Sequence, residues 1–145
     1  MYISMNLEFM KSERLKHPYW NRLKFPTEEE MKIVFKQAIS SEDEINIFVA
    51  EYNSKVVGYA NTWCVYSIWT MGKSLIVDDL YVCQEYRNKG FGKEIMKYLI
   101  DYAKVNRFKR VQLNAEKNNI IAQNLYKKLD FADEDMVFFM KKLDE

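Results

Sequence analysis

The sequence predicts an α/β (α+β) domain built on a mixed, mostly antiparallel central sheet with helices packed on it. Three runs rich in β-branched and aromatic residues follow one another with short turns between them, which favours an antiparallel meander. A strand, a helix and a further strand come next, and that order favours a parallel crossover. The chain has 145 residues, of which 48% are hydrophobic, so residues 1–145 are expected to form a single domain.

The first nine residues fit two structures. Apolar residues alternate along residues 1–9 as in a strand, while those at positions 3, 7 and 10 also share a helical face. Periodicity leaves both structures open. The next element is a helix from about Glu28 to Ile39, because Thr27 and Glu30 have the spacing of a capping box and apolar residues follow at helical intervals.

The meander is read from composition and turns. The runs Ile45–Glu51 and Val56–Ser67 predict a hairpin, because residues 52–55 between them have turn composition. A second turn over residues 69–73 leads into a third strand, Leu75–Val82.

The second half alternates helix and strand. Apolar residues between positions 95 and 103 form one helical stripe, and Arg110–Ala115 has the composition of a strand. A short helix over Asn119–Leu129 and a last strand over Met136–Leu143 complete the predicted elements.

The segment Arg87-Asn88-Lys89-Gly90-Phe91-Gly92 lies between a predicted strand and a predicted helix. Glycines allow close approach of the backbone, and the free N–H groups of a helix start suit a pyrophosphate. Two familiar phosphate loops are excluded: Lys93 is followed by Glu94 rather than by a magnesium-binding Ser or Thr, and Ile95 occupies the third-glycine slot of a dinucleotide fingerprint. An ordinary strand-to-helix turn is the alternative reading of this segment.

Composition narrows the function classes. The formal net charge of +1 gives no field that favours nucleic acid or a membrane surface. No apolar run reaches the roughly 18 residues of a membrane span and no signal peptide is recognised, so a cytoplasmic location is expected. Cys64, Cys83 and the single His17 are too few for a disulfide framework, and we expect no metal site.

The predicted short helix carries polar groups on one face. At about 100° per residue, Asn119, Ala122 and Tyr126 fall nearly on one line, which places an amide and a hydroxyl together. The alternative is that Tyr126 is an amphipathic tyrosine at the edge of the core.

Taken together, Leu80-Tyr81-Val82, the Arg-x-x-Gly-x-Gly segment that starts at Arg87, and Asn119-x-x-Ala122-x-x-Leu125-Tyr126 followed by Phe131 resemble the GNAT superfamily of acetyl-CoA-dependent N-acetyltransferases. The resemblance spans about Ile45 to Leu143. Within the superfamily, Trp69 and the Gly72-Lys73 turn that leads to Asp78-Asp79 look like the diamine (spermidine/spermine) acetyltransferase branch.

The resemblance implies helices on both faces of the sheet and a splay between the strands at 75–82 and 110–115, with acetyl-CoA as a cosubstrate in the opening. Unpaired strand groups at Leu80 and Val82 would pair with the pantetheine arm, and the amides from Asn88 to Lys93 would bind the pyrophosphate. The implied coenzyme-binding residues are Leu80, Tyr81, Val82, Arg87, Asn88, Lys89, Gly90, Phe91, Gly92, Lys93, Asn119 and Ala122. For each of the cations Arg87, Lys89 and Lys93, a solvated surface role is the alternative.

Similar enzymes transfer acetyl directly to an amine, which requires a base and an acid. The resemblance implies Tyr126 as the acid for the coenzyme A sulfur and Asp78 as the base, acting through a water. Strand alternation predicts that Asp78 and Asp79 face opposite sides, so that only one of them lies in the pocket, and which of the two is the base stays open.

The expected acceptor is a small primary amine, either a polyamine or an amino-acid-like amine. It would be selected by residues near the N-terminus and by the aromatic segment that contains Tyr59, Trp63, Tyr66 and Trp69. The alternatives are an enzyme for protein amines and a non-catalytic acyl-CoA-binding module.

Two departures from the family pattern stand out. Asp130 replaces the usual glycine at the end of the short helix, where a left-handed conformation is expected. The opening strand is either missing or formed by residues 1–9. A missing edge strand would expose pairing groups that a second copy can cover, so a homodimer is expected.

Overall fold

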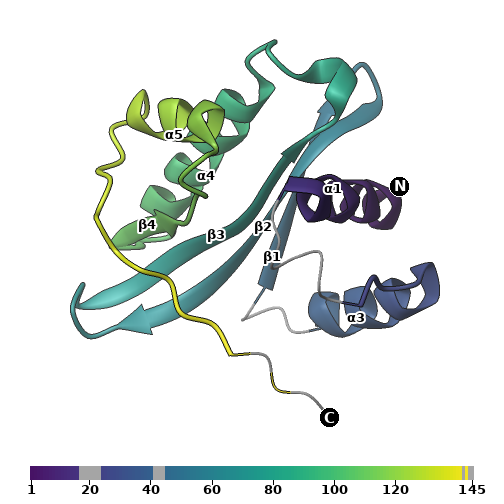
Figure 1. The fold of residues 1–145 in the computed structure, drawn as a ribbon. Helices are drawn as coiled ribbons and strands as arrows, with labels where there is room; N and C mark the ends of the chain where they lie inside the picture. The colour runs from purple at the N-terminus through teal and green to yellow at the C-terminus, as the bar shows by residue number, and fades with distance from the viewer. Residues whose placement is uncertain (17–23, 41–44, 142, 144–145) are drawn as a thin grey trace. The chain divides into compact units, whose positions relative to one another are not determined.

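The computed structural model describes residues 1–16, 24–40, 45–141 and 143, and it divides into two compact units, Met1–Asn114 and Ala115–Glu145. We describe each unit by itself. In the larger unit, helices α1 (Tyr2–Lys16) and α3 (Glu28–Ser40) lie on one side of a sheet and α4 (Phe91–Val105) lies on the other (Figure 1). None of the helices in the described ranges has the length and apolar character needed to cross a membrane.

The sheet has four strands in the order β1-β2-β3-β4. The strands are β1 (Ile45–Tyr52), β2 (Lys55–Ser67), β3 (Gly72–Val82) and β4 (Arg110–Leu113). The first three are antiparallel neighbours, and β4 pairs parallel to β3 after the crossover through α4. The predicted hairpin, third strand, crossover and mixed sheet are therefore confirmed.

Helix α1 decides between the two readings of the first nine residues. Tyr2, Met5 and Phe9 recur at the i, i+3, i+7 spacing of one helical face and pack against the buried Tyr59 and Tyr81 of the sheet. The helical spacing prevails over the alternation because it places these three side chains on one apolar surface. Within residues 1–16 and 24–40 there is no strand, so the described part of the chain has none before β1.

Helix α3 begins with the predicted capping box. The Thr27 hydroxyl accepts a hydrogen bond from the Glu30 N–H at 3.2 Å, and the Glu30 carboxylate accepts one from the Thr27 N–H at 2.7 Å. The predicted helix from about Glu28 to Ile39 is confirmed with one further residue at its end.

Helix α4 covers the opposite face of the sheet. Its buried residues are Ile95, Met96, Leu99 and Ala103, four members of the predicted apolar stripe. The ring of Phe48 in β1 lies edge-on to those of Tyr98 and Tyr102, with centroid distances of 5.9 and 4.9 Å. These contacts hold the second half of α4 against β1.

Gly58 in β2 allows this close packing. A Cβ atom at this position would lie 2.6 Å from the Tyr81 carbonyl oxygen and 3.1 Å from Cδ1 of Ile95. We expect Gly58→Ala to lower the free energy of unfolding by about 2 kcal/mol or more, because a backbone atom cannot move aside locally. Urea denaturation measures this change.

Gly72→Ala is the matched control for Gly58→Ala. Its added Cβ would meet Cγ of Lys109 at 2.7 Å, but that atom belongs to a flexible side chain that can turn away. We expect Gly72→Ala to lower the free energy of unfolding several times less than Gly58→Ala does. Equal losses at the two positions would contradict the packing argument.

The smaller unit contains α5 (Ile120–Lys127), which confirms the predicted short helix with slightly shorter bounds. Its end forms a Schellman motif: the Phe131 N–H donates to the Tyr126 carbonyl at 3.1 Å, and the Asp130 N–H donates to the Lys127 carbonyl at 3.2 Å. Asp130 has φ of 62°, so the expected left-handed conformation is confirmed. The ring of Phe131 lies 6.0 Å from that of Tyr126, which is the apolar contact typical of this motif.

Asp130→Gly should stabilise the protein. Glycine adopts positive φ without the steric cost that a Cβ atom imposes, so we expect a gain of about 1 kcal/mol or less and a higher melting temperature. Thermal unfolding followed by circular dichroism measures the change. Asp130→Ala removes the same carboxylate but keeps the Cβ, and it should give no gain; a melting temperature that falls in the glycine variant would show that this conformation is not strained.

The predicted strand over Met136–Leu143 is wrong. Residues 136–141 and 143 have no strand structure, and most of their large apolar side chains are exposed, with Phe139 at 88%. Alternating or continuous apolar composition predicts a strand only where a neighbouring strand accepts its backbone hydrogen bonds, and the sequence pattern does not contain that partner.

Candidate active site

A β-bulge in β3 shapes the candidate site. Asn61 of β2 pairs with Asp79, whereas the next residue, Thr62, pairs with Val77, so Asp78 is the extra residue on the bulged strand. A bulge interrupts the strict alternation of side chains. Asp78 and Asp79 consequently line the same pocket, and the prediction that they face opposite sides is wrong.

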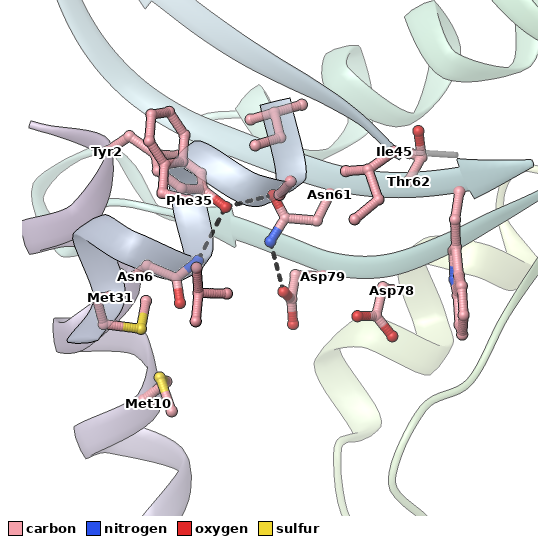
Figure 2. Close-up of a pocket in the computed structure, with 14 residues that line it drawn as sticks. Tyr2, Asn6, Met10, Met31, Phe35, Ile45, Asn61, Thr62, Asp78 and Asp79 are labelled. Carbon is pink, nitrogen blue, oxygen red and sulfur yellow. Dashed lines mark hydrogen bonds between the residues drawn. The ribbon is translucent and has the colours of Figure 1, made fainter. Parts of the chain in front are cut away.

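The pocket lies on the α1 and α3 side of the sheet and has a volume of about 360 Å³ (Figure 2). Its walls come from α1, α3 and strands β1 to β3. The lining is mainly apolar and aromatic, with two carboxylates, and no described lining residue is a lysine, arginine or histidine. The residues are Tyr2, Asn6, Met10, Met31, Val34, Phe35, Ala38, Ile45, Ile47, Asn61, Thr62, Trp63, Asp78 and Asp79.

A chain of three hydrogen bonds crosses the pocket from α1 to β3 (Figure 2). The Asn6 amide donates to the Tyr2 hydroxyl at 3.2 Å, and the Tyr2 hydroxyl donates to Oδ1 of Asn61 at 2.7 Å. Nδ2 of Asn61 then donates to Oδ2 of Asp79 at 2.7 Å. In the described part of the chain Asp78 accepts no hydrogen bond, so the two carboxylates have different surroundings.

The electrostatics of the two aspartates also differ. Burial raises the pKa of Asp79, and the hydrogen bond from Asn61 opposes that rise. Partial burial raises the pKa of Asp78, although its side chain is open to solvent. A carboxylate whose pKa is raised towards neutrality is a better proton acceptor than an ordinary aspartate, and its opening to solvent lets a proton leave.

The carboxyl end of β3 has an open edge. The ladder between β3 and β4 ends at Val77 and Leu113, and β3 continues for five residues beyond it. Because the Cys83 N–H donates to the Val57 carbonyl of β2 at 2.9 Å, strand alternation directs the backbone groups of Leu80 and Val82 away from β2. The larger unit therefore has an unpaired β3 edge beyond the end of β4, whose four residues are all paired with β3, and a divergence of the two strands stays a prediction.

Tyr81 is not brought to this edge. It pairs with Tyr59 of β2 in the ladder, and its side chain is 2% exposed beneath α1. Its place in the structure is therefore in the core between α1 and the sheet.

The predicted pyrophosphate segment lies directly after this edge. Gly90 has φ of 88° and is the N-cap of α4, so the chain needs a residue that tolerates a left-handed conformation there. Asn88 has φ of 60°, and asparagine tolerates this conformation better than most residues. In the described structure, the six N–H groups of residues 88–93 donate to no protein acceptor. A row of free N–H groups at a helix start is a site for an anion.

The side chains of this segment have separate roles. Nε of Arg87 donates to the Val82 carbonyl at 2.9 Å, and its guanidinium carbon lies 5.4 Å from the centre of the Tyr81 ring. Its terminal nitrogens donate no hydrogen bond among the described residues. The ring of Phe91 packs edge-on to those of Tyr52 and Tyr86, at 5.2 and 5.7 Å, so its side chain is structural. Nζ of Lys89 lies 5.5 Å from the Tyr86 ring.

Of the remaining predicted site residues, three lie in the smaller unit. Asn119 is the N-cap of α5, and its Oδ1 accepts the Ala122 N–H at 3.2 Å, which leaves the amide nitrogen as a donor. Tyr126 lies one helical turn beyond Ala122, and burial raises the pKa of its phenol. The phenol is therefore protonated at neutral pH, as an acid must be before it donates a proton.

Of the four aromatic residues expected at the acceptor site, only Trp63 lines the pocket. Tyr59 is fully buried in the core, while Tyr66 and Trp69 are exposed, Trp69 at 97%. The sequence analysis expected residues near the N-terminus at this site but did not identify Tyr2 and Asn6, and it missed Asn61. For Asn61 the one available signal was a polar residue in the middle of an apolar strand.

No group of three potential metal-ligating side chains gathers in the described ranges. His17 lies outside the described residues. Cys64 and Cys83 are free thiols, and burial raises the pKa of Cys83.

A mixed sheet with an open β3 edge, followed by free amides at the start of a helix, has the layout of a protein that binds an extended ligand with an anionic group. Residues 8–131 match the acetyltransferase (GNAT) family. The chain therefore belongs to this family of N-acetyltransferases.

Three proteins show what this chain is similar to. An uncharacterized N-acetyltransferase of Bacillus subtilis, YhfO, is 29% identical over 100 residues, which are 69% of this chain and 67% of that protein. The thialysine N-ε-acetyltransferase of mouse is 36% identical over 80 residues, 55% of this chain and 46% of the mouse protein. A possible acetyltransferase from Clostridium difficile 630 has a TM-score of 0.73 at 23% identity, covering 99% of this chain and 90% of that one. The match thus spans about half the length of the mouse relative.

Proposed function

We propose that this protein transfers the acetyl group of acetyl-CoA directly to a primary amine of a small cationic molecule. The single observation that carries the acceptor class is the pocket beneath α1, which combines two carboxylates with apolar and aromatic walls. Such walls favour a cationic amine with an apolar spacer.

The residues present fit acetyl-CoA. The free N–H groups of residues 88–93 and the terminal nitrogens of Arg87 suit the diphosphate. The backbone groups of Leu80 and the N–H of Val82 suit the amides of a pantetheine arm, which can pair with them as a strand would. The Val82 carbonyl already accepts a hydrogen bond from Arg87. Lys93 is exposed and available as a further cation, while Asn119 and Ala122 stay predicted contacts.

The acceptor nitrogen must lose two protons on its way from ammonium to amide, and the departing sulfur takes up one. Acetyl-CoA, when bound, supplies the acetyl group as a thioester. Asp78 accepts the first proton from the ammonium group of the acceptor, directly or through a water, so that the nitrogen can attack the thioester carbon, and later releases that proton to solvent. Tyr126 donates its phenolic proton to the sulfur as the carbon–sulfur bond breaks, and its phenolate recovers a proton from the nitrogen, which loses its second proton as the amide forms. The products are an N-acetylated amine, coenzyme A and one proton.

The lining of the pocket favours a polyamine over an amino-acid-like amine. An amino acid brings a carboxylate, and no described lining residue carries a positive charge to pair with it. Placing that carboxylate beside Asp78 and Asp79 would cost free energy, because like charges repel at short range. The name of the mouse relative describes action on thialysine, an amino acid, so the acceptor proposed here differs from the one in that name.

The test is a coenzyme A-release assay with acetyl-CoA and a panel of diamines, lysine-like amino acids, aminoglycosides and lysine-containing peptides. We expect diamines to give the highest kcat/KM. Peptides as the best acceptors would favour a protein amine acetyltransferase. Binding of acetyl-CoA without turnover on any amine would instead identify a non-catalytic acyl-CoA-binding module.

A homodimer is part of the proposal. In the described part of the chain, β1 has no strand partner on its outer edge, and exposed strand edges are commonly covered by another chain. Light scattering coupled to gel filtration measures the mass in solution. A cytoplasmic location stays a prediction.

A further inference from the structure

The two carboxylates of the pocket are held in different ways. The hydrogen-bond chain from Asn6 through Tyr2 and Asn61 ends on Oδ2 of Asp79. Asp78 lies beside it on the bulge with no hydrogen-bond donor among the described residues (Figure 2). This difference indicates that Asp78 and Asp79 have different roles in the site.

The direction of the chain is determined at its first link. The Asn6 amide nitrogen can only donate, so the Tyr2 oxygen accepts and its own proton points to Oδ1 of Asn61. With that oxygen occupied, the amide nitrogen of Asn61 faces Asp79. Asp79 must therefore accept, which a deprotonated carboxylate does best, and neighbouring bonds in such a chain strengthen one another.

We propose that Tyr2 and Asn61 are positioning residues that hold Asp79 as a fixed anionic anchor for one ammonium group of a diamine. Asp78 is then left to accept the proton from the other ammonium group. This inference rests on the proposed acetylation of an amine and assigns separate roles to the two aspartates. It also makes α1 part of the acceptor site.

The charged and titratable groups around Asp79 come from three elements. They are Asp78 on β3, Glu13 and Tyr2 on α1, and Tyr59 on β2. Glu13 is paired with Lys16. The pocket-lining residues of α3 and β1 are apolar, so they contribute no titrating group.

Removing the hydrogen-bond donor to Asp79 changes the pKa of this carboxyl group in a predictable direction. A hydrogen bond to a carboxylate favours its charged form and lowers its pKa, so its loss raises the pKa. We expect the Asp79 pKa to rise in Asn61→Leu and to rise by a smaller amount in Tyr2→Phe, which removes a bond one step further from the carboxylate. The charged anchor is then lost at a higher pH than in the unmodified protein.

Tyr2→Phe is the sharpest variant, because it removes one hydroxyl and keeps the ring. That ring packs against Phe35 at 4.8 Å and Tyr59 at 5.1 Å, and phenylalanine preserves both contacts. Tyr59→Phe is the matched control. Tyr59 lies outside the pocket in the same core, and its buried hydroxyl has no partner in the described structure.

The first measurement needs no turnover. Carboxyl carbon NMR titration of aspartate-labelled protein, with Asp79→Asn to assign the signal, reports the Asp79 pKa in each variant. We expect an upward shift in Tyr2→Phe and none in Tyr59→Phe. Equal Asp79 pKa values in the unmodified protein, Tyr2→Phe and Asn61→Leu would overturn the inference.

The second measurement separates positioning from folding. With a diamine, Tyr2→Phe should raise KM about tenfold and change kcat less than twofold, because it disturbs an anchor rather than the reacting group. With a monoamine of the same length, which has no second ammonium group, both constants should stay unchanged. Equal effects on both amines would overturn the anchor, whereas an unmodified protein that acetylates no amine would refute the proposed function instead.

Discussion

Tyr126→Phe is expected to lower kcat by about 10²-fold or more while the Kd for acetyl-CoA stays within about twofold. The phenol is the only group that the proposal assigns to protonate the departing thiolate, and phenylalanine lacks that proton. The ring contact with Phe131, at 6.0 Å, is available to phenylalanine as well, so the end of α5 should be preserved. Steady-state kinetics and isothermal titration with acetyl-CoA in the absence of an amine provide the two measurements.

Phe131→Leu is the control for Tyr126→Phe. It alters the packing against Tyr126 but keeps the hydroxyl, so it should reduce stability more than turnover. An unchanged kcat in Tyr126→Phe would remove the hydroxyl from the mechanism, and a large loss of coenzyme affinity would assign it a binding role.

Asp78→Asn is expected to lower kcat/KM for a diamine by about 10²-fold at pH 7. The side-chain amide in this variant cannot take a proton from the acceptor amine. That amine has a pKa of about 10 and is almost fully charged at pH 7. As the pH approaches that pKa, the free amine becomes abundant and the base is no longer needed. The deficit should therefore shrink to within about tenfold near pH 10.

Asp79→Asn provides the matched comparison for Asp78→Asn. It removes the same charge from the same pocket, but the assigned anchor role predicts a rise in KM rather than a fall in kcat. A pH-independent deficit in Asp78→Asn, or identical profiles for the two variants, would contradict the assignment of Asp78 as the base.

Local sequence rules predicted much of the fold. The capping box at Thr27 and Glu30, the hairpin around residues 52–55 and the left-handed Asp130 all depend on contacts within a few residues, and each is present. The same rules did not choose between strand and helix for residues 1–9. That choice depends on the apolar surface of Tyr59 and Tyr81, which lies far along the chain.

The segment proposed to bind the pyrophosphate could be located from the sequence, and the pocket proposed for the acceptor could not. A pyrophosphate segment is contiguous, because backbone amides of adjacent residues perform the binding. An acceptor pocket draws side chains from five elements, and the apolar residues among them are indistinguishable from core in the sequence. Simple strand alternation predicted that Asp78 and Asp79 face opposite sides of the sheet. That prediction was wrong because the sequence contains no signal for the β-bulge at Asp78.

By itself, the sequence determined the order of helices and strands from α3 to α5, the turn that leads into α4, and the residues available for acid and base chemistry. These follow from periodicity, turn composition and residue type, which act over short distances along the chain. Only the tertiary structure decided that α1 is a helix, that both aspartates enter one pocket, and that Asn61 reaches Asp79. Each of those depends on the pairing register and packing of segments distant in sequence, where a shift of one residue redirects a side chain to the opposite face of the sheet.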